Sequence, residues 1–268
     1  MLSCVLLCSL VSAGAGGDGK LEIVNPRATY GHLGAARPKG TGILPGDVAH
    51  VAFEVNNLKH DDKGQSSYSI AIEVRDGSGE LFYKQEPFNS VAQNFFGGNS
   101  LPCSAQLEIP QNAKPGTYSW KVTIHDRLAN KSATVSGKGD VLKADFGLIR
   151  VGTYADAEGK VPVPSVGMVG STIYVNFAAV GFARSGKSKQ PDLAVGMKIL
   201  DENGKATFAK PITGHVKSDI PASLNIIPLQ YGVTLNRPGR FTIQLSAHCE
   251  LCGKTSTVSI PGRFLPLF

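Results

Sequence analysis

The chain repeats itself at an interval of about 124 residues, and this repeat constrains its fold more than any other feature. Matched positions follow one another in the same order along both halves, and their offset drifts by only a residue or two. The matches include Thr29-Tyr30 with Thr153-Tyr154, Gly46 with Gly170, Phe53 with Phe177, and Lys114-Pro115-Gly116-Thr117-Tyr118 with Arg237-Pro238-Gly239-Arg240-Phe241. Because such collinear matches rarely arise by chance, the sequence predicts a tandem duplication. A length of 268 residues also suits two domains of ordinary size.

Within each copy, apolar residues alternate with polar ones, which is the period of a strand with one buried face. The clearest runs are 49–55 and its counterpart 173–179, together with 118–124, which places Trp120 in the core. No segment of comparable length shows a capped helical stripe. The 31 glycines and 16 prolines supply frequent turns. The sequence therefore predicts an all-β protein of two tandem antiparallel β-sandwich (Ig-like) domains, at residues 16–145 and 146–268.

The first 15 residues have the pattern of a secretory signal peptide. Leu2 to Val11 is an apolar run, and small residues follow it, with Ala13-Gly14-Ala15 as the expected cleavage site. No Lys or Arg precedes the run. Neither this run nor any later segment reaches the ~20 residues that a membrane-spanning helix needs. We therefore expect a secreted, periplasmic or cell-surface protein without a transmembrane segment, and cleavage would remove Cys4 and Cys8.

A resemblance to a known family lies in the stretch 115–126, Pro-Gly-Thr-Tyr-Ser-Trp-Lys-Val-Thr-Ile-His-Asp, followed by Lys131 to Val135. This stretch resembles the last two strands of bacterial immunoglobulin-like or fibronectin III-like modules. The likeness covers about two dozen residues per copy, and the second copy departs from it with Phe241 in place of Tyr and Cys249 in place of Asp. The resemblance implies a β-sandwich and a secreted habitat, and it brings no catalytic residues with it.

Cys249 and Cys252 form the strongest candidate for chemistry, because a Cys-x-x-Cys pair can be a disulfide, half of a metal site or a redox couple. The repeat places both cysteines at the hairpin between the last two strands. Zinc would need four ligands, and no second such pair exists in the sequence. A redox couple would need a helix amino terminus. We expect a disulfide that clamps the hairpin, with metal binding, redox activity or reduced thiols as alternatives, and neither a metal nor another cofactor.

Cys103 is then the odd cysteine of the mature chain. It stands beside a predicted strand start, where it is either a buried thiol or one half of an intermolecular disulfide. The sequence does not fix the oligomeric state.

The net positive charge of the chain comes entirely from the second copy. Residues 16–145 contain 14 Lys and Arg against 14 Asp and Glu, whereas residues 146–268 contain 13 against 7. Arg184, Lys187 and Lys189 share one loop, which could contact a protein partner or a polyanion. Nucleic acid is not an expected partner, because no stacking aromatics are interleaved with these cations.

Two further loops attract attention. Phe95-Phe96 before Gly97-Gly98 is an apolar tip that either contacts a ligand or tucks one ring under the sandwich end. His60, Asp61 and Asp62 resemble an acid–base group, but they stand in a polar stretch whose counterpart has no acid, so a solvated loop is expected.

Catalytic signatures are missing from the sequence: it has no nucleophile elbow, no H-E-x-x-H and no phosphate-binding glycine loop. The sequence therefore predicts a non-enzymatic structural or protein-interaction module of the cell envelope or extracellular space. Its partner would be an unknown protein or an envelope polymer. The alternative is a carbohydrate- or polyanion-binding module, and an enzyme is the third possibility.

Overall fold

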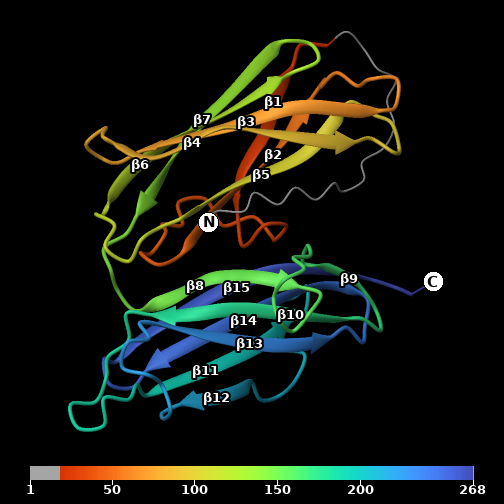
Figure 1. The fold of residues 1–268 in the computed structure, drawn as a ribbon. Helices are drawn as coiled ribbons and strands as arrows, with labels where there is room; N and C mark the ends of the chain where they lie inside the picture. Colours follow the sequence, from red (N-terminus) through yellow and green to blue (C-terminus); the bar gives the residue numbers. More distant parts are fainter. Residues whose placement is uncertain (1–18, 268) are drawn as a thin grey trace.

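The computed structural model describes residues 19–267, and all regular structure in that range is β-strand (Figure 1). The all-β prediction is confirmed. The predicted signal peptide at 1–15 lies outside the described residues. Those residues contain no helix long and apolar enough to cross a membrane. The strands in the first half are β1 (Glu22–Thr29), β2 (Val48–Asn56), β3 (Gln65–Arg75), β4 (Leu81–Gln93), β5 (Ser100–Glu108), β6 (Gly116–Asp126) and β7 (Lys131–Val141). Those in the second half are β8 (Gly147–Tyr154), β9 (Val166–Met168), β10 (Thr172–Val180), β11 (Leu193–Leu200), β12 (Ile212–Val216), β13 (Ile226–Thr234), β14 (Gly239–Cys249) and β15 (Lys254–Leu265).

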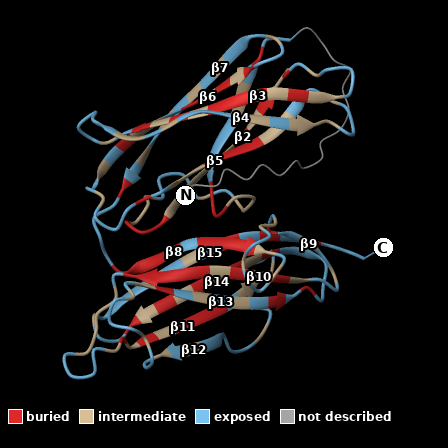
Figure 2. Ribbon diagram, viewed as in Figure 1, coloured by how far each residue is buried: buried red, intermediate tan, exposed pale blue. Residues whose placement is uncertain are grey.

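The strands form four sheets, two in each half of the chain. In the first half, the sheet β1-β2-β5 packs on the sheet β4-β3-β6-β7. In the second half, the sheet β8-β10-β13 packs on β12-β11-β14-β15-β9. All neighbours are antiparallel except β9 and β15, which pair in parallel. Figure 2 shows the buried residues between the layers of each half.

Each half has its own hydrophobic core, supplied by the alternating residues of both sheets. The first core contains Phe53 and Val55 from β2 and Ile70, Val122 and Ile124 from the facing sheet. The second core contains the corresponding positions of β10, β11 and β14, which include Phe177, Met197, Ile243 and Leu245. Trp120 is half-buried against the first core.

The strand orders of the two halves correspond, and so do their backbone irregularities. Asn25 and Arg150 both have a φ of 53°, and each stands at a register shift in the first strand of its half. Gly46 and Gly170 have φ values of 93° and 94° in the turn before β2 and β10. An L residue rarely adopts these angles, so their recurrence at matched positions reflects the same local path of the chain.

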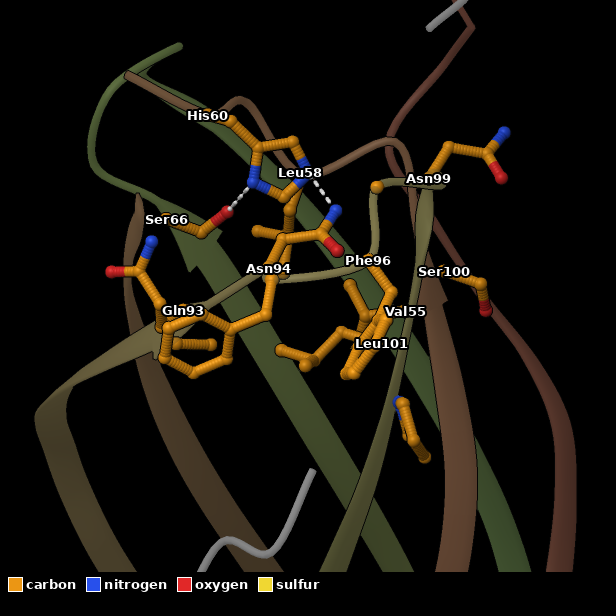
Figure 3. A pocket seen from close by; sticks show the side chains of 14 residues that line it. Val55, Leu58, His60, Ser66, Gln93, Asn94, Phe96, Asn99, Ser100 and Leu101 are labelled. Carbon is orange, nitrogen blue, oxygen red and sulfur yellow. Dashed lines mark hydrogen bonds between the residues drawn. The ribbon is translucent and has the colours of Figure 1, made fainter. Parts of the chain in front are cut away.

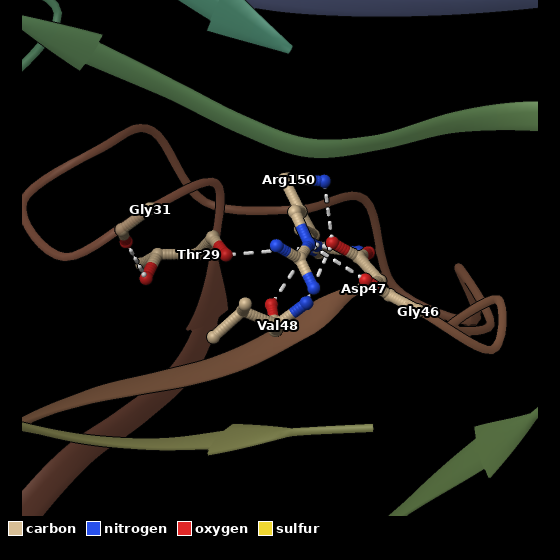
Figure 4. A network of polar contacts seen from close by, with 7 residues as sticks. Thr29, Gly31, Gly46, Asp47, Val48 and Arg150 are labelled. Carbon is tan, nitrogen blue, oxygen red and sulfur yellow. Dashed lines mark hydrogen bonds and ion pairs between the residues drawn. The ribbon is translucent and has the colours of Figure 1, made fainter. Parts of the chain in front are cut away.

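Contacts between the halves centre on Asp47, which is buried at the start of β2 (Figure 4). Its carboxylate accepts hydrogen bonds from the guanidinium of Arg37 at 2.9 Å and from the backbone amides of Val48 at 2.8 Å and Arg150 at 2.6 Å. The Arg150 side chain in turn donates to the carbonyl of Gly46 at 2.8 Å and pairs with Glu108. We name Arg37, Asp47 and Arg150 the interdomain clasp.

The loop between β1 and β2 fills the space beside this clasp. Tyr30 is buried against the second core, and the Arg37 guanidinium lies 4.9 Å from the centre of its ring. His50 is also held there: burial first, then the positive charges of His32 and Arg37, lower the pKa of His50 to about 4. The His50 imidazole is therefore neutral in the folded protein at neutral pH.

Candidate functional site

A pocket of about 220 Å³ opens at the end of the first sandwich, where the loop after β2 meets the loop between β4 and β5 (Figure 3). The two loop regions that build it contain His60, for which a solvated loop was expected, and the predicted contact pair Phe95-Phe96. Its apolar lining is provided mainly by Val55, Leu58, Leu101 and Pro102. The rim consists of His60, Ser66, Gln93, Asn94, Phe95, Phe96, Asn99 and Ser100.

The His60 ring holds the two loops together. Its Nδ1 is 2.6 Å from the Ser66 hydroxyl, and its Nε2 is 3.3 Å from the Asn94 side-chain nitrogen, which also donates to the carbonyl of Gly98 at 2.8 Å. The Asn94 nitrogen can only donate, so Nε2 accepts and the ring proton resides on Nδ1. Both ring nitrogens are thus engaged with protein groups, and His60 positions the Asn94 carboxamide.

Phe95 and Phe96 stand out of the protein, with 81% and 69% of their surfaces exposed. They are the two most exposed large apolar residues in the described part of the chain. The structure thus places this tip outward and does not tuck a ring under the sandwich end. Exposed paired rings at a pocket rim are unusual in a monomeric protein unless they meet a partner.

At the equivalent end of the second sandwich, the apolar side chains of the loops pack inward. Arg184 follows β10 as His60 follows β2, and it too bridges two loops. There, however, Ile220 and Leu224 of the opposite loop pack on the core beside Phe182. In the second sandwich the apolar side chains of this loop pack on the core. Their counterparts in the first sandwich, Phe95 and Phe96, are exposed.

Arg184 itself is not a free cation. Its guanidinium donates to the carbonyl oxygens of Lys189 at 2.8 Å, Pro221 at 2.9 Å and Leu224 at 2.7 Å, and it lies over the Phe182 ring. Lys187 and Lys189 are exposed on the same loop. Of the three basic residues predicted as a partner or polyanion contact, one is thus committed to loop structure and two remain available.

Asp61 and Asp62 do not gather with His60 into an acid–base site. The Asp61 carboxylate accepts hydrogen bonds from the backbone amides of Lys63 and Gln65, both at 2.9 Å, so it shapes the turn. Asp62 is exposed. No cluster of three or more His, Cys, Asp or Glu suited to a metal ion occurs among the residues described.

Cys249 and Cys252 are joined by a disulfide at the hairpin between β14 and β15. In the first half Asp126 occupies the equivalent position, and its buried carboxylate accepts the backbone amide of Ala129 at 2.9 Å. The Cys249 sulfur accepts the amide of Cys252 at 3.2 Å. Cys249 therefore provides an acceptor for the amide three residues later, as Asp126 does in the first half, and the disulfide adds a covalent link. Cys103 is buried in β5, within the first core.

Two features of the structure were not predicted from the sequence. The pairing of His60 with Asn94 joins residues from different loops, and no local pattern marks it. The interdomain clasp likewise joins Asp47 to a residue more than 100 positions away. The only sequence signal for the pocket was the Phe-Phe-Gly-Gly tip, where an apolar pair precedes two glycines.

No protein-family model matches the chain, and no curated protein matches its sequence. Solved structures give distant matches. The C-terminal domain of the Streptococcus pyogenes antigen I/II-family protein AspA is 10% identical, with 91% of this chain and 100% of that chain covered and a TM-score of 0.31. The C-terminal domain of the Streptococcus agalactiae AgI/II polypeptide BspA is 9% identical, with 89% and 99% covered and a TM-score of 0.29. Scores this low assign neither a fold family nor a function.

Proposed function

We propose that this chain is a non-enzymatic extracellular binding module, exported by a signal peptide at residues 1–15. It consists of two Ig-like β-sandwiches that arose by duplication, at residues 16–145 and 146–268. The corresponding strand orders and the matched positive-φ residues support the duplication. In this proposal the first sandwich binds the ligand and the second supports it through the interdomain clasp.

The observation that carries the proposal is the open end of the first sandwich. Duplicated copies begin with the same packing, so the copy that exposes two Phe rings differs from the copy that packs Ile220 and Leu224 on its core. Exposed rings around a pocket supply binding energy when a ligand covers them, because apolar surface leaves water. The proposed contact residues are Phe95 and Phe96.

The lining of the pocket favours binding over catalysis. None of the pocket-lining residues is Asp, Glu, Lys, Arg or Cys. The one titratable side chain there, His60, uses both ring nitrogens to hold Ser66 and Asn94. With the ring proton on Nδ1, His60 donates to Ser66 and cannot take its proton, and the Ser66 side chain is buried, so we assign a binding role.

Polyanion binding by the second sandwich is the second candidate. Lys187 and Lys189 are exposed on one loop of the second half, which has the net positive charge of the chain. The elution of Lys187→Gln/Lys189→Gln from a heparin column, compared with the unaltered protein, tests this candidate. Elution of both proteins at the same low salt concentration would contradict it.

The main proposal is tested with the mature protein on two probe collections, an array of glycans and a displayed peptide library. A genuine ligand binds the unaltered protein, loses affinity for Phe95→Ser/Phe96→Ser, and keeps its affinity for Phe88→Ser. Phe88 is 53% exposed on β4 and lines no part of the pocket, so it is a matched control. A protein that bound no member of either collection, or bound equally well in all three forms, would contradict the proposal.

A further inference from the structure

The hydrogen-bonding groups around the pocket are biased toward acceptance. The side-chain nitrogen of Gln93 donates to the carbonyl of Lys63 at 2.6 Å, that of Asn94 donates to Gly98 at 2.8 Å, and that of Asn99 donates to Asn57 at 3.1 Å. All three amide nitrogens are thus engaged with the protein. Their side-chain oxygens accept none of the hydrogen bonds found within the described residues. Figure 3 shows the Asn94 carboxamide centrally in the pocket, so the Asn94 oxygen is the one available there to a ligand that donates.

Charge restricts the ligand further. A carboxylate, sulfate or phosphate would meet amide oxygens and no cation in the pocket, because no Lys or Arg lines it. An ammonium or guanidinium would find no carboxylate there. A wholly apolar ligand would cover the amide oxygens without giving them a hydrogen bond, which is costly. An uncharged ligand that carries several hydroxyl groups satisfies these conditions.

The shape of the site agrees with this chemistry. A volume of about 220 Å³ is smaller than the ~300–1,000 Å³ of sites for drug-sized molecules, so one ring-sized group enters. The two exposed Phe rings extend the surface beyond the pocket. Asn94 and Phe96 both line the pocket, and in the view of Figure 3 the Asn94 carboxamide lies between His60 and Phe96. Aromatic rings cover the C–H face of a sugar while nearby acceptors bind its hydroxyls.

We propose that the pocket binds one uncharged sugar unit of a polysaccharide, with the sugar's C–H face on Phe96 and one of its hydroxyls donating to the Asn94 side-chain oxygen. This assignment rests on the proposed binding function and adds the ligand class. Phe95 covers the adjoining unit of the same polymer. His60 acts as a positioning residue, because its hydrogen bond to the Asn94 side-chain nitrogen fixes the carboxamide.

The experiment measures retention of the mature protein in affinity gels that contain neutral polysaccharides: β-glucan, mannan, xylan and galactan. Heparin and the displayed peptide library serve as comparators. We expect retention by at least one neutral polymer, a loss of tenfold or more in affinity for Phe95→Ser/Phe96→Ser, and unchanged affinity for Phe88→Ser. Thermal unfolding confirms that each variant is folded.

The outcomes separate the ligand class from the binding function. Peptides that bind through the Phe pair, without retention by any neutral polysaccharide, would overturn the sugar assignment and leave the binding function standing. Retention that survives loss of both Phe rings would overturn the assignment of the site. Failure to bind any polysaccharide or peptide would overturn both proposals.

Discussion

The backbone amide of Arg150 donates a 2.6 Å hydrogen bond to the carboxylate of Asp47, across 103 residues of sequence. The same carboxylate pairs with the guanidinium of Arg37, and both side chains of this ion pair are nearly inaccessible to solvent. One buried acceptor therefore ties the turn before β2 to the first strand of the second sandwich. Removal of the Asp47 carboxylate should therefore destabilise both halves of the chain.

Asp47→Asn is expected to lower the free energy of unfolding by about 3 kcal/mol, because it leaves the Arg37 guanidinium buried without its counter-charge. Guanidinium chloride titration followed by tryptophan fluorescence measures the change. Asp62→Asn is the control: Asp62 is exposed, and its replacement should change stability by no more than about 0.5 kcal/mol. Equal effects of the two substitutions would show that the clasp contributes nothing particular.

Arg184→Gln is expected to destabilise the protein by about 2 kcal/mol, because three well-placed carbonyl acceptors lose a charged donor. Hydrogen exchange should rise in the loops 182–191 and 219–224, which this side chain connects. Lys187→Gln, on the exposed part of the same loop, should leave both stability and exchange unchanged. A variant at Arg184 with unaltered exchange in the second loop would contradict the bridging role.

Removing the disulfide with Cys249→Ala/Cys252→Ala is expected to cost only about 2 kcal/mol, because the cysteines are 3 residues apart and the closed loop is very short. Thermal unfolding with and without a reducing agent measures this. The reductant should lower the unfolding temperature of the unaltered protein and leave that of the double variant unchanged. Sensitivity of the variant to the reductant would point to another disulfide.

Stability should fall on mild acidification because of His50. Burial, together with His32 and Arg37, lowers the pKa of His50 from 6.5 to about 4, so the unfolded chain binds a proton more readily than the folded one. The contribution of His50 is therefore complete above pH 6.5 and is lost as the pH falls from there toward 4. Between pH 7 and pH 5 the expected loss is about 2 kcal/mol.

His50→Leu tests whether His50 causes this loss of stability, because it removes the titrating imidazole. It also removes the ring nitrogen Nδ1, which is buried without a hydrogen bond. The difference in unfolding free energy between pH 7 and pH 5 should shrink by about 2 kcal/mol in this variant. His125→Gln is the matched control on the outer face of β6, where the imidazole forms a hydrogen bond with the Ser132 hydroxyl. An unchanged pH dependence in His50→Leu would show that other groups cause the loss.

The alternation of apolar residues made the strands predictable, because a residue such as Phe53 or Ile243 has to face a core whichever strands lie beside it. The Pro-Gly turns at Gly116 and Gly239 were equally local signals, since both glycines adopt positive φ at the start of a strand. Strand β4 was not predicted. It lies at a sheet edge, and its apolar residues Leu81, Phe88 and Val91 are more than half exposed, so no clean alternation results.

The candidate site was predictable only in its apolar part. Phe95-Phe96 was recognisable as a loop tip, but the contacts that make a pocket of it depend on the Asn94 side chain meeting His60, 34 residues away. The sequence showed that Arg184 is positively charged. That its guanidinium lies among carbonyl oxygens depends on how two loops pack in the folded protein, which the sequence does not show. Residue type alone does not show whether a cation is available to a partner.

Strand β2 begins beside the interdomain clasp at Asp47 and ends beside the pocket loop, so it spans about 30 Å between the two. A pull on a polymer held by the proposed contact residues Phe95 and Phe96 would enter the sandwich at the start of β5, while the clasp holds β2 at its start. These two points lie at opposite ends of the antiparallel ladder between β2 and β5, so the ladder would be loaded in shear and its hydrogen bonds would share the force. Under the proposed function, the geometry predicts that the first sandwich resists such a pull better than a pull that opens the ladder from one end.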